Sequence, residues 1–426
     1  MKKLGVALFI ALLATSAVAQ TARQEIEANI CLSGSNYLAY PTPQKSLTKA
    51  PKGKTPFYIS HYARHGSRFL INPDKYIKTL ETLQKAYEEG KLTSKGCEVL
   101  EKVRMMCAES NNRYGELTAL GAEQHRGIAR RMYERFPEVF KGNVNIDAKS
   151  TVVIRCILSM ENELQELISI NPKLSITHDA SEHDMYYMNY DDTNLGSKRK
   201  NDATKAYMDK WTKEHINPQR MMERLFTDQD YVSKNVSAAK LYDNLFELAG
   251  ILQGTELRKK FTLYDIFDKD EMYNLWEQRN IGWFMEYGSN ELNGGKMPFQ
   301  QRNLLRNIIT EADSCIMHPR PGATLRFGHE TMVMPLTCLL DLNGYGKTMN
   351  PSELSENEWK NYKIFPMACN IQFIFYRKDI NDKDVLVKVL LNEEEATMPI
   401  ATTDFPYYRW EDVRAYYLNK INAYIN

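Results

Sequence analysis

The stretch from Phe57 to Phe69, FYISHYARHGSRF, constrains the fold more than any other part of the chain. It opens with the apolar run 57–59, which is typical of a short buried strand. Arg64, His65 and Arg68 follow at once, with a glycine among them. The planar donors of a guanidinium group match the geometry of phosphate oxygens, and glycine lets the backbone approach a ligand closely. Open α/β sheets bind their ligands beyond the carboxyl ends of their strands. We interpret this stretch as an anion site; a solvated basic turn is the simpler alternative.

The first 19 residues have the pattern of an export signal. Two lysines at positions 2 and 3 precede an apolar run over 4–14, and Ala17-Val18-Ala19 is a small-residue cleavage site. The run is shorter than the roughly 20 apolar residues that a transmembrane helix needs. We therefore expect export by a bacterial signal to the periplasm or the medium, without a membrane span.

Charge and cysteine content narrow the classes of function. The formal net charge of the 426-residue chain is +1, and loss of the two leader lysines brings it to −1. A near-neutral chain has no global field for nucleic acid or a membrane surface, so an anion site must be local. Seven cysteines allow one or two bridges in an oxidising compartment, and Cys97 and Cys107 are the closest pair. Because no C-x-x-C or paired-histidine spacing occurs, we predict no structural zinc.

The first half of the chain reads as a surface segment followed by helices and strands. Residues 20–50 are polar and rich in turn residues, and we expect them to wrap over the surface. Apolar spacing predicts helices over about 74–91, 94–110 and 118–136, the last with Thr118 as its N-cap. His125 lies on that third helix, and we interpret it as a structural histidine.

Residues 144–157 predict a strand, a loop and a helix that starts near Arg155. A cation at a helix start is disfavoured by the macrodipole. An anion bound at the same helix end removes that conflict. Arg155 is therefore a second candidate anion ligand.

The character of the chain changes between residues 178 and 300, where strand patterns nearly vanish. We expect a mostly helical inserted domain there, with an α/β domain formed by 20–177 and 301–426. Within the insertion, Lys198, Arg199 and Lys200 form a basic cluster, which is either a solvated face or a wall facing a polyanionic substrate. Arg279 lies among aromatic residues of a predicted helix and is consistent with either role.

A strand pattern returns after residue 300. Residues 323–327 predict a strand that ends at Gly328-His329-Glu330-Thr331, so a second histidine follows a strand end beside a glycine. Residues 373–376 and 385–391 predict a β-hairpin, and 410–425 predict a closing helix.

Together, the two histidines, three arginines and one acid indicate phosphoryl transfer. A neutral imidazole attacks phosphorus, guanidiniums hold the phosphoryl oxygens, and an acid protonates the leaving oxygen. Since the guanidiniums supply the positive charge, we expect no metal and no cofactor.

These motifs resemble the histidine acid phosphatases, a branch of the histidine phosphatase superfamily. Residues 64–68 match the R-H-G-x-R motif, 117–124 match L-T-x-x-G-x-x-Q, and Arg155 stands where the family has its third arginine. Softer patterns at 326–336, 366–370, 391–393 and 407–410 are most similar to bacterial multiple inositol polyphosphate phosphatases, which dephosphorylate phytate. The resemblance implies a phosphoglycerate-mutase-like α/β fold: a mostly parallel sheet flanked by helices, with an inserted helical domain.

The resemblance also implies roles for single residues. His65 is the nucleophile, and the scissile phosphate is bound by Arg64, Arg68, Arg155 and His329. Glu330 is the proton donor, although it occupies the family's aspartate or alanine position, and Thr331 occupies the glutamate position of the Ala-Glu form. The candidate specificity contacts for inositol phosphates are Lys198, Arg199, Lys200 and Arg279.

Three alternatives stay open. The first is a broad-specificity or sugar-phosphate phosphatase of the same fold. The second is a phosphoglycerate-mutase-like transferase, against which an export signal argues. The third is a phosphate-ligand binding protein on an inactive phosphatase scaffold, which would have lost a catalytic residue.

Overall fold

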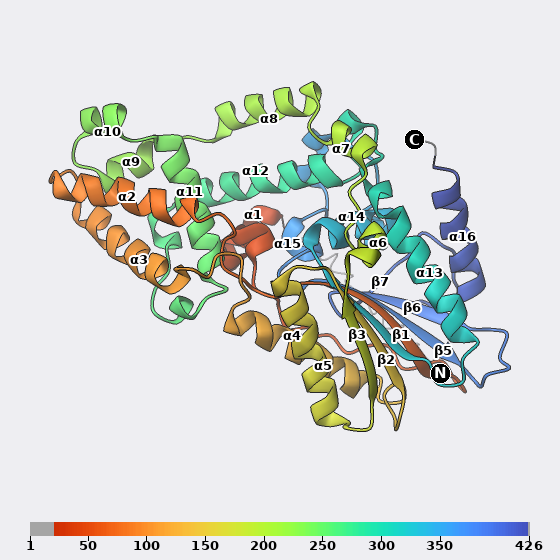
Figure 1. Ribbon diagram of the computed structural model, residues 1–426. Coiled ribbons are helices and arrows are strands. Elements are labelled where there is room, and N and C mark those ends of the chain that lie inside the picture. The colour runs from red at the N-terminus through yellow and green to blue at the C-terminus, as the bar shows by residue number, and fades with distance from the viewer. Residues whose placement is uncertain (1–20, 425–426) are drawn as a thin grey trace, which may run out of the picture.

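The computed structural model describes residues 21–424, and the predicted leader lies outside this range. The chain forms a central β-sheet with helices on both faces and a helical region beside it (Figure 1). The predicted α/β class is therefore confirmed. None of the described helices is long and apolar enough to cross a membrane.

One mixed sheet organises the described chain. Its strand order is β3-β2-β4-β1-β5-β6-β7, with β8 paired to β6. β1 to β4 and β6 share one direction, whereas β5, β7 and β8 run the other way. The predicted hairpin is formed by β5 and β6. The strands are β1 (Thr55–Arg64), β2 (Asn145–Ser150), β3 (Ser175–Ala180), β4 (Gly322–Gly328), β5 (Asn370–Arg377), β6 (Leu386–Leu391), β7 (Glu394–Ala396) and β8 (Tyr408–Arg409).

The helices agree with the predicted ones where the apolar spacing was clear, as in α2, α3 and α4. In chain order they are α1 (Ala22–Ala28), α2 (Asp74–Glu88), α3 (Ser94–Ser110), α4 (Ala119–Arg135), α5 (Ile154–Ile170), α6 (Met185–Met188), α7 (Thr193–Arg199) and α8 (Asp202–His215). They continue with α9 (Gln219–Leu225), α10 (Gln229–Asn235), α11 (Ala238–Leu252), α12 (Lys269–Tyr287), α13 (Arg302–Ile316), α14 (Glu330–Leu340), α15 (Asn361–Ile364) and α16 (Trp410–Asn422).

β1 lies in the middle of the sheet and is buried on both faces. Its side chains alternate, so that Ile59 packs towards α4 and α5 and Tyr58 packs towards α13, α14 and α16. Because both faces are covered, the strand continues through Ser60 and His61, beyond the predicted 57–59. β1 thus carries Arg64 to the carboxyl edge of the sheet.

The helical region has a core of its own. Apolar side chains of α9, α10 and α11 pack against those of α2 and α3, which precede the predicted insertion in the chain. In Figure 1 these five helices lie together, apart from the sheet. The division into an α/β domain and an insertion at 178–300 stays a prediction.

The segment before β1 does not simply wrap over the surface, as we had expected. Its 3₁₀ helix η1 (Ile30–Tyr37) contacts α11, α12 and α15, and its residues from Ser33 to Asn36 are buried. A Cβ on Gly34 would lie 2.3 Å from Nε2 of Gln253, so the glycine permits this close packing. Since the segment is polar, its sequence gave no sign of burial.

The seven cysteines, all in the described part of the chain, are free. The bridges that the sequence allowed, including one between Cys97 and Cys107, are not formed.

Candidate active site

The loop after β1 is held by the end of β4, the residues just before β5 and the start of α4. The backbone N–H of Arg64 donates to Cys369 O (2.8 Å), and that of His65 donates to Gly328 O (3.0 Å). His65 O in turn accepts from Ala368 N (3.0 Å). These bonds fix the histidine at the carboxyl edge of the sheet, where α/β proteins bind ligands.

A pair of glycines allows this loop to touch α4. A Cβ on Gly66 would lie 2.4 Å from Gly121 O, and one on Gly121 would lie 2.2 Å from Ser67 O. Both distances are far below any real Cβ contact, so neither position tolerates a side chain without movement. The glycines of the two sequence motifs are thus required by the same contact.

Two polar residues of α4 complete the support of the loop. Gln124 Oε1 accepts from Ser67 N (2.8 Å), and Gln124 Nε2 donates to Ser67 Oγ (2.9 Å). Thr118 is the N-cap of α4, as predicted, and its hydroxyl also donates to Ser67 O (3.0 Å). The segment L-T-x-x-G-x-x-Q therefore positions the loop that carries His65.

His65 presents one ring nitrogen to the site. Its Nδ1 donates to Gly66 O (2.9 Å), which leaves Nε2 unprotonated and facing Glu330. Burial, together with the nearby Arg64 and Arg68, holds the pKa of His65 well below its usual value. A neutral imidazole with a free, buried nitrogen is suited to attack on phosphorus.

Three guanidiniums surround this nitrogen and keep donors unused. Nη2 of Arg64, Nε of Arg68 and Nε of Arg155 are buried without a hydrogen-bond partner. Burial lowers the pKa of Arg155, with Arg68 and Arg64 adding to the effect. Burying donors without partners on clustered cations costs free energy unless an anion accepts hydrogen bonds from them. The cluster is therefore suited to a dianion such as a phosphoryl group.

His329 closes the other side of the site. Its ring centroid lies 5.8 Å from that of His65, and its Nε2 lies 3.3 Å from Thr151 Oγ1. Burial lowers its pKa to about 4. His329 and Val153 are the N-caps of α14 and α5, and neither helix has a side-chain cap. Two helix amino ends thus add their N–H groups and dipoles to the anion site.

Glu330 places a carboxylate against the same cluster. Its Oε2 lies 3.0 Å from Arg64 Nε and 3.7 Å from His65 Nε2. Burial alone would raise its pKa, but Arg64 and Arg68 outweigh burial and lower it to about 2. Glu330 is therefore a carboxylate that partly neutralises Arg64.

His65, His329 and Glu330 also have the donor atoms of a metal site, all within 4.8 Å of one another. The three guanidiniums in direct electrostatic contact with these ligands oppose a divalent cation at that point. The donor set therefore suits an anion better than a metal ion.

The four candidate specificity residues differ in their surroundings. Arg279 donates to Asp243 Oδ1 (2.7 Å) and stacks on Phe246, so it belongs to the helical core. Lys198 is exposed, and Lys200 pairs with Glu286 (3.1 Å) and is otherwise exposed.

Arg199 is the least exposed member of the basic cluster. Its Cζ lies 4.5 Å from the ring centroid of Tyr287, and its Nη2 donates to Gln300 Oε1 (3.1 Å) and to Asp191 Oδ1 (3.3 Å). Its buried Nε has no partner. Burial raises the pKa of Tyr287, and this ring lies within electrostatic range of both Arg199 and Glu330.

His125 lies beneath the loop and not in the site. Its Nδ1 lies 2.7 Å from Glu163 Oε1, and both side chains are completely buried between α4 and α5. This agrees with the structural interpretation made from the sequence.

Sequence reasoning missed several residues that complete the site. Asn36 of η1 accepts from Arg64 Nη1 (2.6 Å) through its carbonyl and donates to Glu330 Oε1 (3.4 Å) through its side chain. The ring of Tyr37 lies 5.7 Å from Arg68 Cζ, and Ser159 Oγ accepts from Gly66 N (3.1 Å). No periodic pattern marks these residues, and Asn36 lies 294 positions from Glu330.

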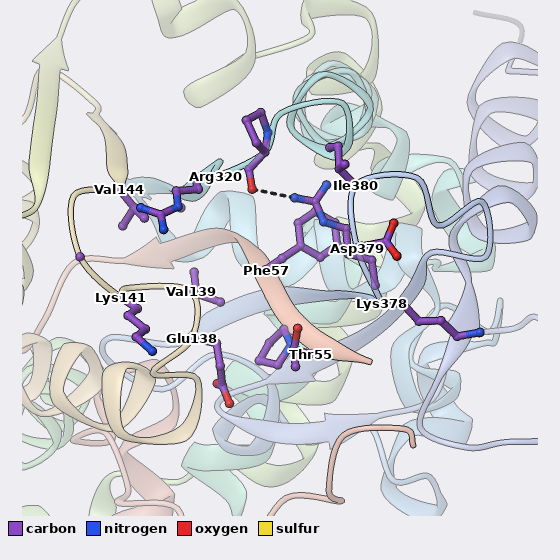
Figure 2. A pocket seen from close by; sticks show the side chains of 15 residues that line it. Thr55, Phe57, Glu138, Val139, Lys141, Val144, Arg320, Lys378, Asp379 and Ile380 are labelled. Atoms are coloured by element: carbon purple, nitrogen blue, oxygen red, sulfur yellow. Dashed lines mark hydrogen bonds between the residues drawn. The ribbon is translucent and has the colours of Figure 1, made fainter. Parts of the chain in front are cut away.

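A hollow elsewhere on the molecule is unrelated to this site. It lies at the amino end of β1 and is lined by Phe57, Lys141, Arg320 and Lys378 among others (Figure 2). Arg64 stands at the opposite end of the same strand. The hollow therefore does not contribute to the cluster around His65.

Comparison with known families agrees with this geometry. The model of the histidine phosphatase superfamily (branch 2) matches residues 62–392, which include the loop after β1, Arg155 and the His329 loop. The chain belongs to this superfamily. No curated protein matches it in sequence.

Solved structures show that the fold of this histidine phosphatase superfamily member is shared widely. The multiple inositol polyphosphate phosphatase of Bifidobacterium longum superposes with a TM-score of 0.77 at 20% identity, covering 90% of this chain and 96% of that one. A phytase from D. castellii gives 0.64 at 14% identity, covering 97% and 90%. A Hafnia alvei phytase gives 0.53 at 12% identity, covering 87% and 98%. At these identities the likeness concerns the fold.

Proposed function

We propose that this protein is a phosphomonoesterase that works through a phosphohistidine on His65. The observation that carries the proposal is a neutral, buried His65 with a free Nε2, within electrostatic range of three arginines whose buried donors have no partner. Arg64, Arg68, Arg155 and His329 would bind the phosphoryl oxygens, and Glu330 would protonate the leaving oxygen. Water would then attack the phosphohistidine and release inorganic phosphate.

We propose inositol polyphosphates, phytate among them, as the substrates. Two of the similar structures are described as a B. longum phosphatase in complex with inositol hexasulfate and a phytase from D. castellii. A substrate with several phosphates needs cations beyond the catalytic cluster. Arg199 is the candidate that the surroundings favour. Its guanidinium lies over the ring of Tyr287, and Tyr287 is within electrostatic range of Glu330. The leader pattern of residues 1–19 supports export to the periplasm or the medium.

Two further functions remain as alternatives. A general acid phosphatase would use the same cluster but would not depend on Arg199. A binding protein would hold phosphate without turnover, yet His65, the three arginines and His329 are all present here, and only the donor position is altered. The alternatives therefore differ in measurable ways.

The test is release of inorganic phosphate at mildly acidic pH, without added metal, from inositol hexakisphosphate and from p-nitrophenyl phosphate. We expect turnover of both by the wild type and of neither by His65→Ala. Arg199→Ala should lower kcat/KM for inositol hexakisphosphate about tenfold, the value of one charge-assisted hydrogen bond, and leave the aryl ester unchanged. Lys200→Ala is the matched control, because Lys200 is exposed and pairs with Glu286.

Each alternative has its own outcome. Cleavage of the aryl ester but not of inositol hexakisphosphate would favour the general phosphatase. Tight phosphate binding by a folded protein that cleaves neither ester would favour the binding protein. Equal losses in Arg199→Ala and Lys200→Ala would remove Arg199 as a specificity contact.

A further inference from the structure

Asn36 is the one described residue that hydrogen-bonds both Arg64 and Glu330. Its carbonyl oxygen accepts from Arg64 Nη1 at 2.6 Å, and its side-chain Nδ2 donates to Glu330 Oε1 at 3.4 Å. Its side chain is buried within η1, a segment that precedes the motif loop by some thirty residues. Asn36 therefore joins the phosphate-binding cluster to the acid.

The backbone that presents Asn36 is strained and firmly held. Ser35 adopts φ 58° and ψ −127°, a region that costs a non-glycine residue about 1–3 kcal/mol. Its hydroxyl accepts from Asn361 Nδ2 (2.7 Å), and Asn361 Oδ1 accepts from Trp276 Nε1 (2.9 Å). Asn280 Oδ1 accepts from Asn361 N (2.8 Å). A strained residue held in this way next to a functional contact indicates that the position of Asn36 matters.

The chemistry of the amide group determines what Asn36 does to Glu330. Only the NH₂ group can face a carboxylate, so Oε1 must be the accepting oxygen. Oε2 has a donor too, because it lies 3.0 Å from Arg64 Nε. When a phosphoryl group takes the place of Glu330 on Arg64 and Glu330 gains a proton, Asn36 still donates to Oε1, so Oε2 is the oxygen that carries the proton. Oε2 lies 3.7 Å from His65 Nε2 and faces the reacting centre.

We propose that Asn36 is a positioning residue, which directs the proton of Glu330 to the oxygen that faces the leaving group. This inference rests on the proposed phosphomonoesterase function. It adds a residue outside all the recognised motifs and assigns it one step, protonation of the leaving alkoxide. No bond to Asn36 forms or breaks: Oε2–H breaks as the P–O bond of the ester breaks, and the leaving oxygen receives that proton.

The two contacts of Asn36 can be separated by mutation. Asn36→Ala removes the amide but keeps the backbone carbonyl that holds Arg64. If the amide acts through the acid, only esters that need protonation should be affected. The alkoxide of glycerol phosphate needs a proton to leave, whereas p-nitrophenolate leaves without one.

The experiment compares kcat/KM for these two esters in the wild type and in Asn36→Ala. We expect about a tenfold loss with glycerol phosphate, part of the 10²–10⁴ that a general acid supplies, and less than a twofold change with p-nitrophenyl phosphate. Asn244→Ala is the matched control: Asn244 is also buried, but it lies in α11, beside Lys78 and Asn235, and its replacement should affect neither ester. Thermal unfolding verifies that each variant is folded.

Asn36→Asp gives a second readout. A carboxylate in place of the amide would raise the pKa of Glu330, so the basic limb of the pH profile for glycerol phosphate should move to higher pH.

The outcomes separate this inference from the proposed function. Equal losses with both esters would show a merely structural role, and no loss with either would show no role; each overturns the inference and leaves the phosphatase intact. A folded wild type that cleaves neither ester overturns the proposed function, and the inference falls with it.

Discussion

Oε2 of Glu330 lies 3.0 Å from Nε of Arg64, and both side chains are almost fully buried. The carboxylate thus takes up one of the guanidinium groups on which the phosphate would depend. A phosphoryl dianion bound between Arg64 and Arg68 would neutralise the charges that hold the pKa of Glu330 at about 2. We infer that the acid is ionised before an anion binds and acquires its proton together with the substrate.

This coupling can be measured with sulfate, a dianion that does not titrate in the relevant range. Binding of sulfate near pH 5 should draw up to one proton from solution, because the folded-state pKa of Glu330 rises towards or above its usual value of about 4.5. Titration calorimetry of sulfate binding in buffers of different ionisation enthalpy gives the number of protons taken up. Glu330→Gln should bind sulfate with no such uptake. The same uptake in the variant would assign the proton to another group.

The identity of the proton donor depends on two adjacent residues. Glu330→Gln should lower kcat/KM for glycerol phosphate about 10²-fold or more and affect p-nitrophenyl phosphate far less. Thr331→Val is the matched control, because Thr331 occupies the position at which the Ala-Glu form of the family has its glutamate. A larger loss in Thr331→Val than in Glu330→Gln would show that the donor has been misassigned.

The contact between Gly66 and Gly121 predicts a large effect from a single methyl group. Gly66→Ala would place a Cβ 2.4 Å from Gly121 O. Overpacking of this kind costs about 1–3 kcal/mol in the free energy of unfolding and would move His65. Gly282→Ala is the control, since nothing lies within 4 Å of its Cβ and alanine is favoured within α12. Urea unfolding measures the loss of stability, and phosphate release measures the loss of activity. An active Gly66→Ala variant of unchanged stability would show that the contact between Gly66 and Gly121 does not position His65.

His61 predicts a pH-dependent loss of stability. It is completely buried, neither ring nitrogen has a partner, and burial lowers its pKa to about 3. Below about pH 6.5 the unfolded chain binds a proton that the folded chain does not, so stability falls as pH falls, by about 1.4 kcal/mol per pH unit from this residue. His61→Leu should flatten the dependence of the unfolding free energy between pH 6 and 4 by that amount. An unchanged slope of unfolding free energy against pH in His61→Leu would show that His61 does not cause the loss of stability.

Local chemistry made part of this fold predictable. The limits of α3 and the N-cap Thr118 follow from apolar spacing and a capping hydroxyl, both of which lie within a few residues of the feature they determine. The placement of His65 and His329 followed from glycines and basic residues at strand ends. Their proximity required only that β1 and β4 be parallel neighbours.

The remaining features depend on contacts between distant segments. The burial of η1 could not be predicted, because its polar residues are satisfied by partners such as Asn361 that lie far along the chain. The packing of α2 and α3 with α9 to α11 was missed for a related reason: an apolar stripe predicts a helix but not its neighbour. Among the basic residues proposed as specificity contacts, only the three-dimensional surroundings distinguish Arg199 from Arg279.

The most direct test of the central claim is to trap the phosphoryl group on the enzyme. The protein is mixed with ³²P-labelled p-nitrophenyl phosphate and denatured within milliseconds, and the labelled peptide is then identified. We expect an alkali-stable, acid-labile phosphohistidine at Nε2 of His65, present in the wild type and absent in His65→Ala. Rapid turnover by the wild type without any label on His65 would rule out His65 as the nucleophile.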